Sequence, residues 1–268
     1  MQFLDYVDMH QPLAIDNIRD LGWLGCEICK CNKYDFMQQQ LTQDVINKLD
    51  KALKKLKDNM PLAYIVGHAP FFGLEFCVDQ NVLIPRMETE QLVEMIIKDN
   101  KSKQNLNILD MCTGSGCIAI ALKKHLDCQV TAVDTSIMAL NMAKQNAQKN
   151  NVVINFLQSD MFQNVNTNFD IIVSNPPYIA SKDLTTLPPN VKNFEPNIAL
   201  DGGVDGLTFY KQIAQDSPKS LKRDGVLYLE IGFDQGQTVP ELLSQNFKQI
   251  QVYKDYDKHS RMVKCVRR

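Results

Sequence analysis

The chain has 268 residues, 44% of them hydrophobic, which is enough for one large domain or a large domain with a smaller one. Its 29 basic and 31 acidic residues give a formal net charge of -2, which argues against binding nucleic acid mainly through its phosphates. The N-terminus lacks the features of a signal peptide, and no segment approaches the roughly 18 apolar residues of a membrane span. We therefore expect a cytoplasmic protein with no membrane association and no stable nucleic-acid binding.

The N-terminal part, to about residue 60, is predicted to be helical. Residues 42–57 place apolar side chains on one face at helical spacing, and Thr42 is positioned to cap that helix. Residues 4–18 show a weaker version of the same pattern, which Pro12 interrupts. This part carries no motif with evident chemistry.

Eight cysteines occur without a secretory signal, so we expect reduced thiols. Three of them form a C-x-x-C-x-C cluster that could suggest zinc, namely Cys26, Cys29 and Cys31. No second cysteine or histidine pair follows at a zinc-ligand spacing. We interpret the cluster as unpaired thiols on a helical segment and expect no metal.

Residues 61–86 have a different texture. The sequence YIVGHAPFFGLEFCVD predicts two short strands around a turn at 68–70, and VLIP predicts a further strand that Pro85 ends. Helical spacing begins at Glu88, and the polar segment 98–105 is predicted to be a linker.

From residue 106 the chain alternates between apolar runs typical of buried strands and runs with helical spacing. Such alternation predicts βαβ units and a mostly parallel sheet, the α/β class. Strands are predicted at 107–112, 129–134, 153–158, 169–175, 226–232, 248–254 and 260–266, and helices at 115–125, 136–149, 207–220 and from about 235. A long loop rich in Pro, Gly and Asp occupies 181–206.

A glycine-containing segment, LDMCTGSG, follows the first of these strands and opens a helix. Glycines allow the backbone to approach a ligand closely, and the free N–H groups at a helix start favour an electronegative group. Asp134 ends the next strand, where a carboxylate can accept hydrogen bonds from both ribose hydroxyls. The pattern is not G-x-G-x-x-G and no P-loop lysine follows, so a nucleoside without a diphosphate, such as S-adenosylmethionine, fits best. A structural turn with an incidental Asp134 is the alternative.

The tetrad N-P-P-Y, from Asn175 to Tyr178, follows the fourth strand of the βαβ series. Open α/β sheets bind ligands at the carboxyl ends of their strands. Two prolines rigidify the turn, and its carbonyls together with the Asn175 amide oxygen can hold a planar –NH2 group in line with a methyl donor. Tyr178 could stack on that group or wall the pocket. Taken alone the tetrad could be a simple loop breaker; behind a cofactor motif it indicates an amino methyltransferase.

Six segments resemble the HemK-type peptide chain release factor glutamine methyltransferases, over about residues 61–264. They are PLAYIVGHAPFFGLEF, VLIPRMETE, DMCTGSG, NPPY, EPNIALDGGVDGLTFY and LEIGFDQG. The resemblance implies a helical N-terminal domain at 1–60, a β-hairpin linker at 61–86 and a seven-stranded class I, Rossmann-like methyltransferase domain at 87–268. It implies N5-methylation of the glutamine in the Gly-Gly-Gln motif of class 1 release factors, which modulates translation termination.

The resemblance also implies roles for individual residues. S-adenosylmethionine would be held by the glycine segment, by Asp134 and by Asn175, with Asp160 and Met161 at the adenine. Asn175 to Tyr178 would hold the glutamine amide and be the catalytic residues, and Phe71 or Phe72 would line the substrate channel. The residues expected to hold the cofactor are therefore Asp110, Cys112, Thr113, Gly114, Ser115, Gly116, Asp134, Asp160, Met161 and Asn175, and those expected to hold the substrate are Asn175, Pro176, Pro177, Tyr178, Phe71 and Phe72.

Two positions depart from the family pattern, which usually has Gly at 112 and Pro at 87. We expect Cys112 to pack behind the loop with its backbone still available, and Met87 to loosen the turn after Arg86. Neither residue touches the predicted chemistry.

Three alternatives remain open. An N6-adenine methyltransferase could use N-P-P-Y equally well, but it must flip a base and grip phosphates, which this slightly acidic chain is poorly suited to do. A ribosomal-protein glutamine methyltransferase is separated only by substrate assay. A vestigial binding module would be expected to lack Asn175 or Asp134, and both are present. We expect a monomer whose N-terminal segment and hairpin dock the release factor.

Overall fold

The computed structural model describes residues 1–13 and 15–268, which form two compact units. The first unit contains Met1–Gly67 and Pro188–Phe194, and the second contains His68–Leu187 and Glu195–Arg268. The two strands of the hairpin, at residues 68–77, fall in the second unit. Part of the predicted helical pattern at 4–18 falls on Ala14, which lies outside the described residues.

The first unit is helical and encloses its own core. Its helices are α1 (Phe3–Met9), α2 (Ile15–Cys29), α3 (Lys33–Gln38), α4 (Gln43–Lys57), α5 (Leu62–Val66) and α9 (Pro189–Lys192). The interruption at Pro12 and the helix at 42–57 are confirmed, and the Thr42 side chain accepts a hydrogen bond from the Val45 N–H at 3.4 Å as predicted. Tyr6, Phe36 and Leu49 are buried at the centre of the core.

The second unit is built on a seven-stranded sheet with the order β5-β4-β3-β6-β7-β9-β8. The strands are β3 (Leu106–Met111), β4 (Cys128–Asp134), β5 (Asn155–Gln158), β6 (Phe169–Ser174), β7 (Leu221–Glu230), β8 (Phe247–Lys254) and β9 (Ser260–Arg267). The first five pair in parallel, and β9 is antiparallel to both β7 and β8. The predicted α/β class and the seven-stranded, mostly parallel sheet are confirmed.

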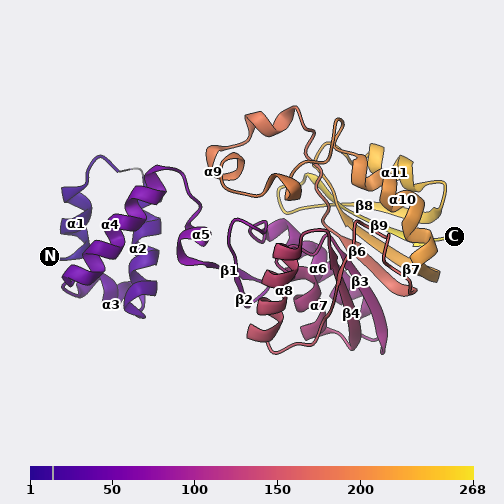
Figure 1. Ribbon diagram of the computed structural model, residues 1–268, viewed down its shortest axis with the longest axis horizontal. Helices are drawn as coiled ribbons and strands as arrows, with labels where there is room; N and C mark the ends of the chain where they lie inside the picture. The colour runs from indigo at the N-terminus through magenta and orange to yellow at the C-terminus, as the bar shows by residue number, and fades with distance from the viewer. Residues whose placement is uncertain (14) are drawn as a thin grey trace. The chain divides into compact units, whose positions relative to one another are not determined.

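Helices cover both faces of this sheet (Figure 1). Successive side chains along each strand point to opposite faces of the sheet, and both sets are buried in hydrophobic clusters. Ile108 and Ile171 pack under α6 (Met87–Asn100), α7 (Cys117–His125) and α8 (Ile137–Lys149). Their neighbours Leu109 and Ile172 pack under α10 (Thr208–Ser220) and α11 (Thr238–Leu243). In the described part of the chain, no helix is long and apolar enough to cross a membrane.

The segment before α6 differs from its prediction. The hairpin of β1 (His68–Phe71) and β2 (Leu74–Cys77) turns at Phe72 and Gly73, not at 68–70. Both turn residues have positive φ, 50° and 72°, as a two-residue hairpin loop of type I′ requires, so Gly73 rather than Pro70 marks the turn. The predicted strand at 82–85 is absent as well, and this stretch is an irregular segment leading into α6.

Candidate active site

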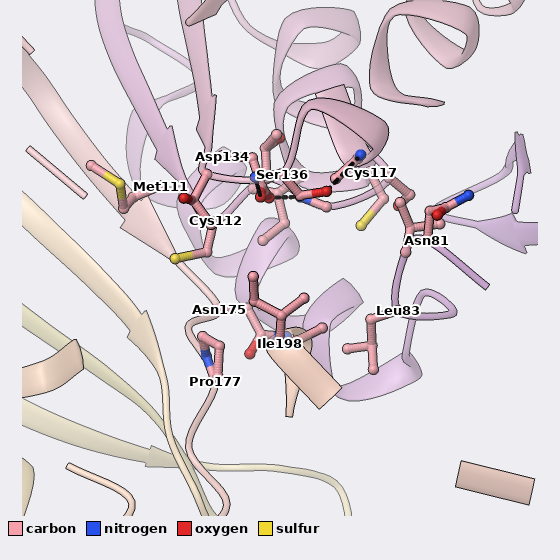
Figure 2. Close-up of a pocket in the computed structure, with 18 of the residues that line it drawn as sticks. Asn81, Leu83, Met111, Cys112, Cys117, Asp134, Ser136, Asn175, Pro177 and Ile198 are labelled. Atoms are coloured by element: carbon pink, nitrogen blue, oxygen red, sulfur yellow. Dashed lines mark hydrogen bonds between the residues drawn. The ribbon is translucent and has the colours of Figure 1, made fainter. Parts of the chain in front are cut away.

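A cavity in the second unit lies where β3, β4 and β6 end (Figure 2). This is where the loops of an open α/β sheet bind ligands. Most of the predicted cofactor residues line it together with two members of the N-P-P-Y turn. The predicted site residues that line this cavity are Cys112, Thr113, Gly114, Ser115, Asp134, Asp160, Met161, Asn175 and Pro177.

The glycine segment forms a tight turn between β3 and α7. Cys112, Gly114 and Gly116 all have left-handed backbones, with φ of 63°, 53° and 81°. Glycine adopts this conformation without strain, whereas a cysteine there costs about 1–2 kcal/mol. The Cys112 thiol lies 3.8 Å from the Met161 sulfur, and burial raises the thiol pKa, so it stays protonated. The thiol therefore packs against Met161.

Asp110 supports this loop from below. It is 0% exposed and does not line the cavity, and its side chain supports the loop. One carboxylate oxygen accepts hydrogen bonds from the Thr113 hydroxyl at 2.6 Å and from the Ala119 N–H at 3.1 Å. Burial raises the pKa of Asp110 to about 7.

Asp134 stands at the end of β4 and faces the cavity (Figure 2). One of its oxygens accepts a hydrogen bond from the Gly114 N–H and the other from the Ser136 N–H, both at 2.9 Å. Burial raises the pKa of this carboxyl. A carboxylate has about four acceptor positions, so two remain for a pair of ribose hydroxyls. The residues present therefore fit a nucleoside cofactor.

Asn175 follows β6 and is held from one side. Its Nδ2 donates a hydrogen bond to Thr89 Oγ1 at 3.2 Å, and the Thr89 hydroxyl donates to Glu230 Oε2 at 2.6 Å. Among the described residues, none donates to Asn175 Oδ1 or to the Pro176 and Pro177 carbonyls. The turn therefore offers several acceptors, and its two prolines contribute no backbone N–H groups.

The rest of the turn is fixed by the loop 195–206 and by Gln235. The Ile179 N–H donates to the Leu200 carbonyl at 3.0 Å, and Gln235 Nε2 donates at 3.1 Å to the carbonyls of both Tyr178 and Gly206. A Cβ on Gly206 would lie 2.4 Å from the Tyr178 oxygen, so this close approach requires glycine. These contacts hold the turn in a single geometry.

Two predicted placements in the turn need correction. The buried Pro176 and the Tyr178 side chain do not line the cavity. Tyr178 packs instead against the core under α10 and α11. Burial there raises the pKa of the Tyr178 hydroxyl to about 12. The ring supports the turn and does not form the cavity wall.

Phe71 and Phe72 also lie away from the cavity. Phe71 is 1% exposed in the core and meets Phe76 edge-on, with ring centroids 5.9 Å apart. Phe72 meets the His125 ring edge-on at 5.1 Å. Both rings therefore contribute to packing, and neither lines the cavity.

Sequence reasoning assigned no role to the segment 81–86, which lines the cavity through Asn81, Leu83 and Arg86. The Arg86 guanidinium forms an ion pair with Glu195, which is 5% exposed. Thr89, Ile198 and Phe209 were missed as well. These residues lie in or near the VLIPRMETE and EPNIAL segments, which served in the sequence prediction only as part of the family resemblance and were given no role in the cavity. Met87 is the first residue of α6, a position that also accepts proline.

The chain is similar to known methyltransferases over most of its length. The methyltransferase small domain family matches residues 87–188. A release factor glutamine methyltransferase of Streptococcus pneumoniae is 42% identical over 86% of this chain and 83% of its own length. One of Lactococcus lactis is 40% identical over 96% and 94%.

Among solved structures, a Thermus thermophilus 16S rRNA guanosine N2 methyltransferase in complex with AdoMet and guanosine has a TM-score of 0.55. It is 16% identical and covers 75% of this chain and 50% of its own, so the likeness concerns the fold alone. The cofactor is S-adenosylmethionine, in line with the match to the methyltransferase family. With relatives more than 40% identical over most of their length, the chain belongs to the family of release factor glutamine methyltransferases.

Proposed function

We propose that this protein transfers a methyl group from S-adenosylmethionine to the side-chain amide nitrogen, N5, of the glutamine in the Gly-Gly-Gln motif of class 1 release factors. The observation that carries this proposal is the shared cavity. Asn175 and Pro177 of the turn and the carboxylate Asp134 line the same space. The names of the relatives supply the protein substrate.

The chemistry follows from what the turn can and cannot do. An amide nitrogen is a poor nucleophile because its lone pair is delocalised into the carbonyl group. The Asn175 oxygen and the Pro177 carbonyl can accept both of its hydrogens, which orients the nitrogen and favours the less conjugated form that develops in the transition state. When bound, S-adenosylmethionine supplies the electrophilic methyl group. No activated Ser, Cys or His is needed.

The cofactor half of the site would work mainly by orientation. Asp134 would hold the ribose, the N–H groups of the loop 112–116 would approach the ligand closely, and Asp160 and Met161 would border the adenine. Together these contacts would direct the methyl group towards Asn175 and keep water from the reacting nitrogen.

The remaining expectations are proposals of the same kind. We propose that residues 1–60 and the hairpin 68–77 dock the release factor, that the enzyme acts as a cytoplasmic monomer, and that it binds nucleic acid at most weakly. The near-neutral formal charge of -2 supports the last point. Cross-linking to a release factor, read by mass spectrometry, should place contacts on both segments; contacts confined elsewhere would contradict the docking proposal.

The experiment that tests the function is mass spectrometry of a purified class 1 release factor incubated with enzyme and S-adenosylmethionine. We expect a gain of about 14 Da, one methyl replacing a hydrogen, on the peptide that contains Gly-Gly-Gln. A release factor with that glutamine changed to alanine should gain nothing. Methylation of a ribosomal protein or an adenine-containing oligonucleotide instead would overturn the assignment.

A further inference from the structure

The side chain of Asn175 has two chemically opposite ends of nearly equal shape. Its oxygen accepts hydrogen bonds, whereas its NH2 group only donates them. Holding a substrate –NH2 requires the Asn175 oxygen to face the cavity. If the Asn175 amide were flipped, its NH2 group would face the substrate –NH2, and two donor groups cannot form a hydrogen bond. The direction in which this amide points is therefore a requirement of the proposed chemistry, and the N-P-P-Y turn alone does not fix it.

A short chain of hydrogen bonds approaches Asn175 from outside the turn. Thr89, in the first turn of α6, lines the cavity and is 2% exposed. Glu230, the last residue of β7, is 2% exposed and does not line the cavity. The bonds run from Asn175 Nδ2 to Thr89 Oγ1 at 3.2 Å and from the Thr89 hydroxyl to Glu230 Oε2 at 2.6 Å.

The polarity of this chain is set at its buried end. An ionised carboxylate can only accept, so the single Thr89 hydroxyl proton is used on Glu230. The lone pairs of Thr89 Oγ1 can then only accept, and the Asn175 NH2 group must turn towards them. We propose that Thr89 and Glu230 are positioning residues that keep the Asn175 oxygen facing the substrate amide. This role rests on the proposed function, because it presumes an –NH2 substrate.

The charged and titratable groups around Glu230 set the pH range in which Glu230 is ionised and the hydrogen bonds run in this direction. Burial, the largest influence, raises the pKa of Glu230 to about 7, and Glu88 acts in the same direction while Arg261 and Arg86 lower it. A protonated Glu230 carboxyl can donate a hydrogen bond to Thr89 Oγ1. The Thr89 hydroxyl can then donate to the Asn175 oxygen, which reverses the direction of the hydrogen bonds. The groups that face Glu230 are Thr89, Arg261, Arg86 and Glu88, with Tyr178, Tyr210 and Cys117 around them.

The first test separates the hydroxyl of Thr89 from its shape. Thr89→Val keeps the volume and removes the donor, whereas Thr89→Ser keeps the donor and removes a methyl group. We expect kcat of the valine variant to fall by about 10–100-fold, with KM for the release factor and cofactor affinity unchanged. The serine variant should remain close to wild type. Thermal unfolding of both variants shows that each is folded.

The second test is a pH profile of kcat at saturating cofactor, which removes any influence of Asp110 or Asp134 on cofactor binding. We expect the wild-type rate to fall as the pH drops through about 7, and Glu230→Gln to be slower and to lack this fall, since its amide does not titrate.

Wild-type kcat in Thr89→Val, equal losses in the serine and valine variants, or an unchanged acid limb in Glu230→Gln would each overturn the positioning role while leaving the proposed function intact. Failure of the wild-type enzyme to methylate the release factor would instead overturn the proposed function, and this role with it.

Discussion

The two halves of the cavity are built in different ways. The cofactor half comes from a continuous βαβ stretch, since the glycine loop and Asp134 are separated only by α7 and β4 and bond directly to each other. The chemical half gathers distant segments around the N-P-P-Y turn. Thr89 lies 86 positions before Asn175, and Gln235 lies 57 positions after Tyr178.

This difference indicates where each half is vulnerable. The cofactor half is held by hydrogen bonds from backbone N–H groups to Asp134 and Asp110 within one supersecondary unit. The chemical half depends on side chains from α6, β7 and the loop after it, so it can be disturbed without disturbing the cofactor. The variants below test whether the two halves separate in this way.

The largest effect is expected for Asn175→Ala. It removes the side-chain acceptor from the chemical half, so kcat should fall by about 10²–10³-fold. Calorimetry should show that S-adenosylmethionine still binds, because the glycine loop and Asp134 are untouched. Asn155→Ala, on the exposed edge strand β5, serves as the matched control and should retain wild-type turnover. Unchanged turnover in Asn175→Ala would contradict the assigned role.

The reciprocal variant is Asp134→Ala. It removes two acceptors for the ribose and the partners of the Gly114 and Ser136 N–H groups. We expect cofactor affinity to weaken on the order of 100-fold, since each hydrogen bond to a charged group contributes roughly 1.5–3 kcal/mol. Turnover at saturating cofactor should be affected much less. Wild-type affinity by calorimetry would remove Asp134 from the cofactor half.

A matched glycine pair tests the support of the turn. Gly206 and Gly73 both have φ of 72°, so alanine costs left-handed strain at either position. Only at Gly206 would the new Cβ meet the Tyr178 carbonyl, at 2.4 Å, whereas nothing lies within 4 Å at Gly73. We expect Gly206→Ala to lower kcat by about tenfold through displacement of the turn, and Gly73→Ala to lower only stability. Equal kcat values would mean that the turn is not held by this contact.

The pH dependence of stability tests the buried end of the chemical half. Glu230 titrates near pH 7 in the folded state and near 4.5 when unfolded, so between these values the folded state holds a proton that the unfolded state has released. This contribution to stability is lost as the pH rises through 7. Glu230→Gln does not titrate, so its free energy of unfolding should improve relative to wild type between pH 5 and pH 8, on the order of 1–3 kcal/mol. If denaturant titrations show the same dependence of the unfolding free energy on pH in wild type and Glu230→Gln, the raised pKa of Glu230 is contradicted.

The smallest effect is expected at Cys112, in the cofactor half. Glycine would relieve the left-handed strain at φ 63° and would lose the contact with the Met161 sulfur. We expect Cys112→Gly to be neutral or more stable by up to about 1 kcal/mol, with unchanged cofactor affinity. A marked loss of affinity would show that the thiol itself contacts the ligand.

Sequence alone predicted the strand, the glycine turn, the helix and the position of Asp134, because these are local signals with fixed spacing. The sheet followed from the same alternation. The hairpin turn was placed wrongly because Pro70 was taken as the turn signal, although a proline can also lie in a two-stranded edge hairpin. Gly73, the residue suited to positive φ, was the better signal.

The chemical half could be predicted only in part. N-P-P-Y gave its centre, but the roles of Thr89, Glu230 and Gln235 depend on tertiary contacts that no local pattern encodes. Asp110 and Tyr178 were assigned to ligands because of their neighbours in sequence, and both turned out to support the loops instead. Adjacency to a motif does not reveal whether a side chain points into the cavity or into the core.

The most direct test of the central claim is a crystal structure of the protein with S-adenosylhomocysteine and a Gly-Gly-Gln peptide. We expect the glutamine side-chain nitrogen within about 2.7–3.2 Å of Asn175 Oδ1 and facing the cofactor sulfur, with the ribose hydroxyls on Asp134. A glutamine amide bound away from residues 175–177, or a ribose that does not reach Asp134, would contradict the account.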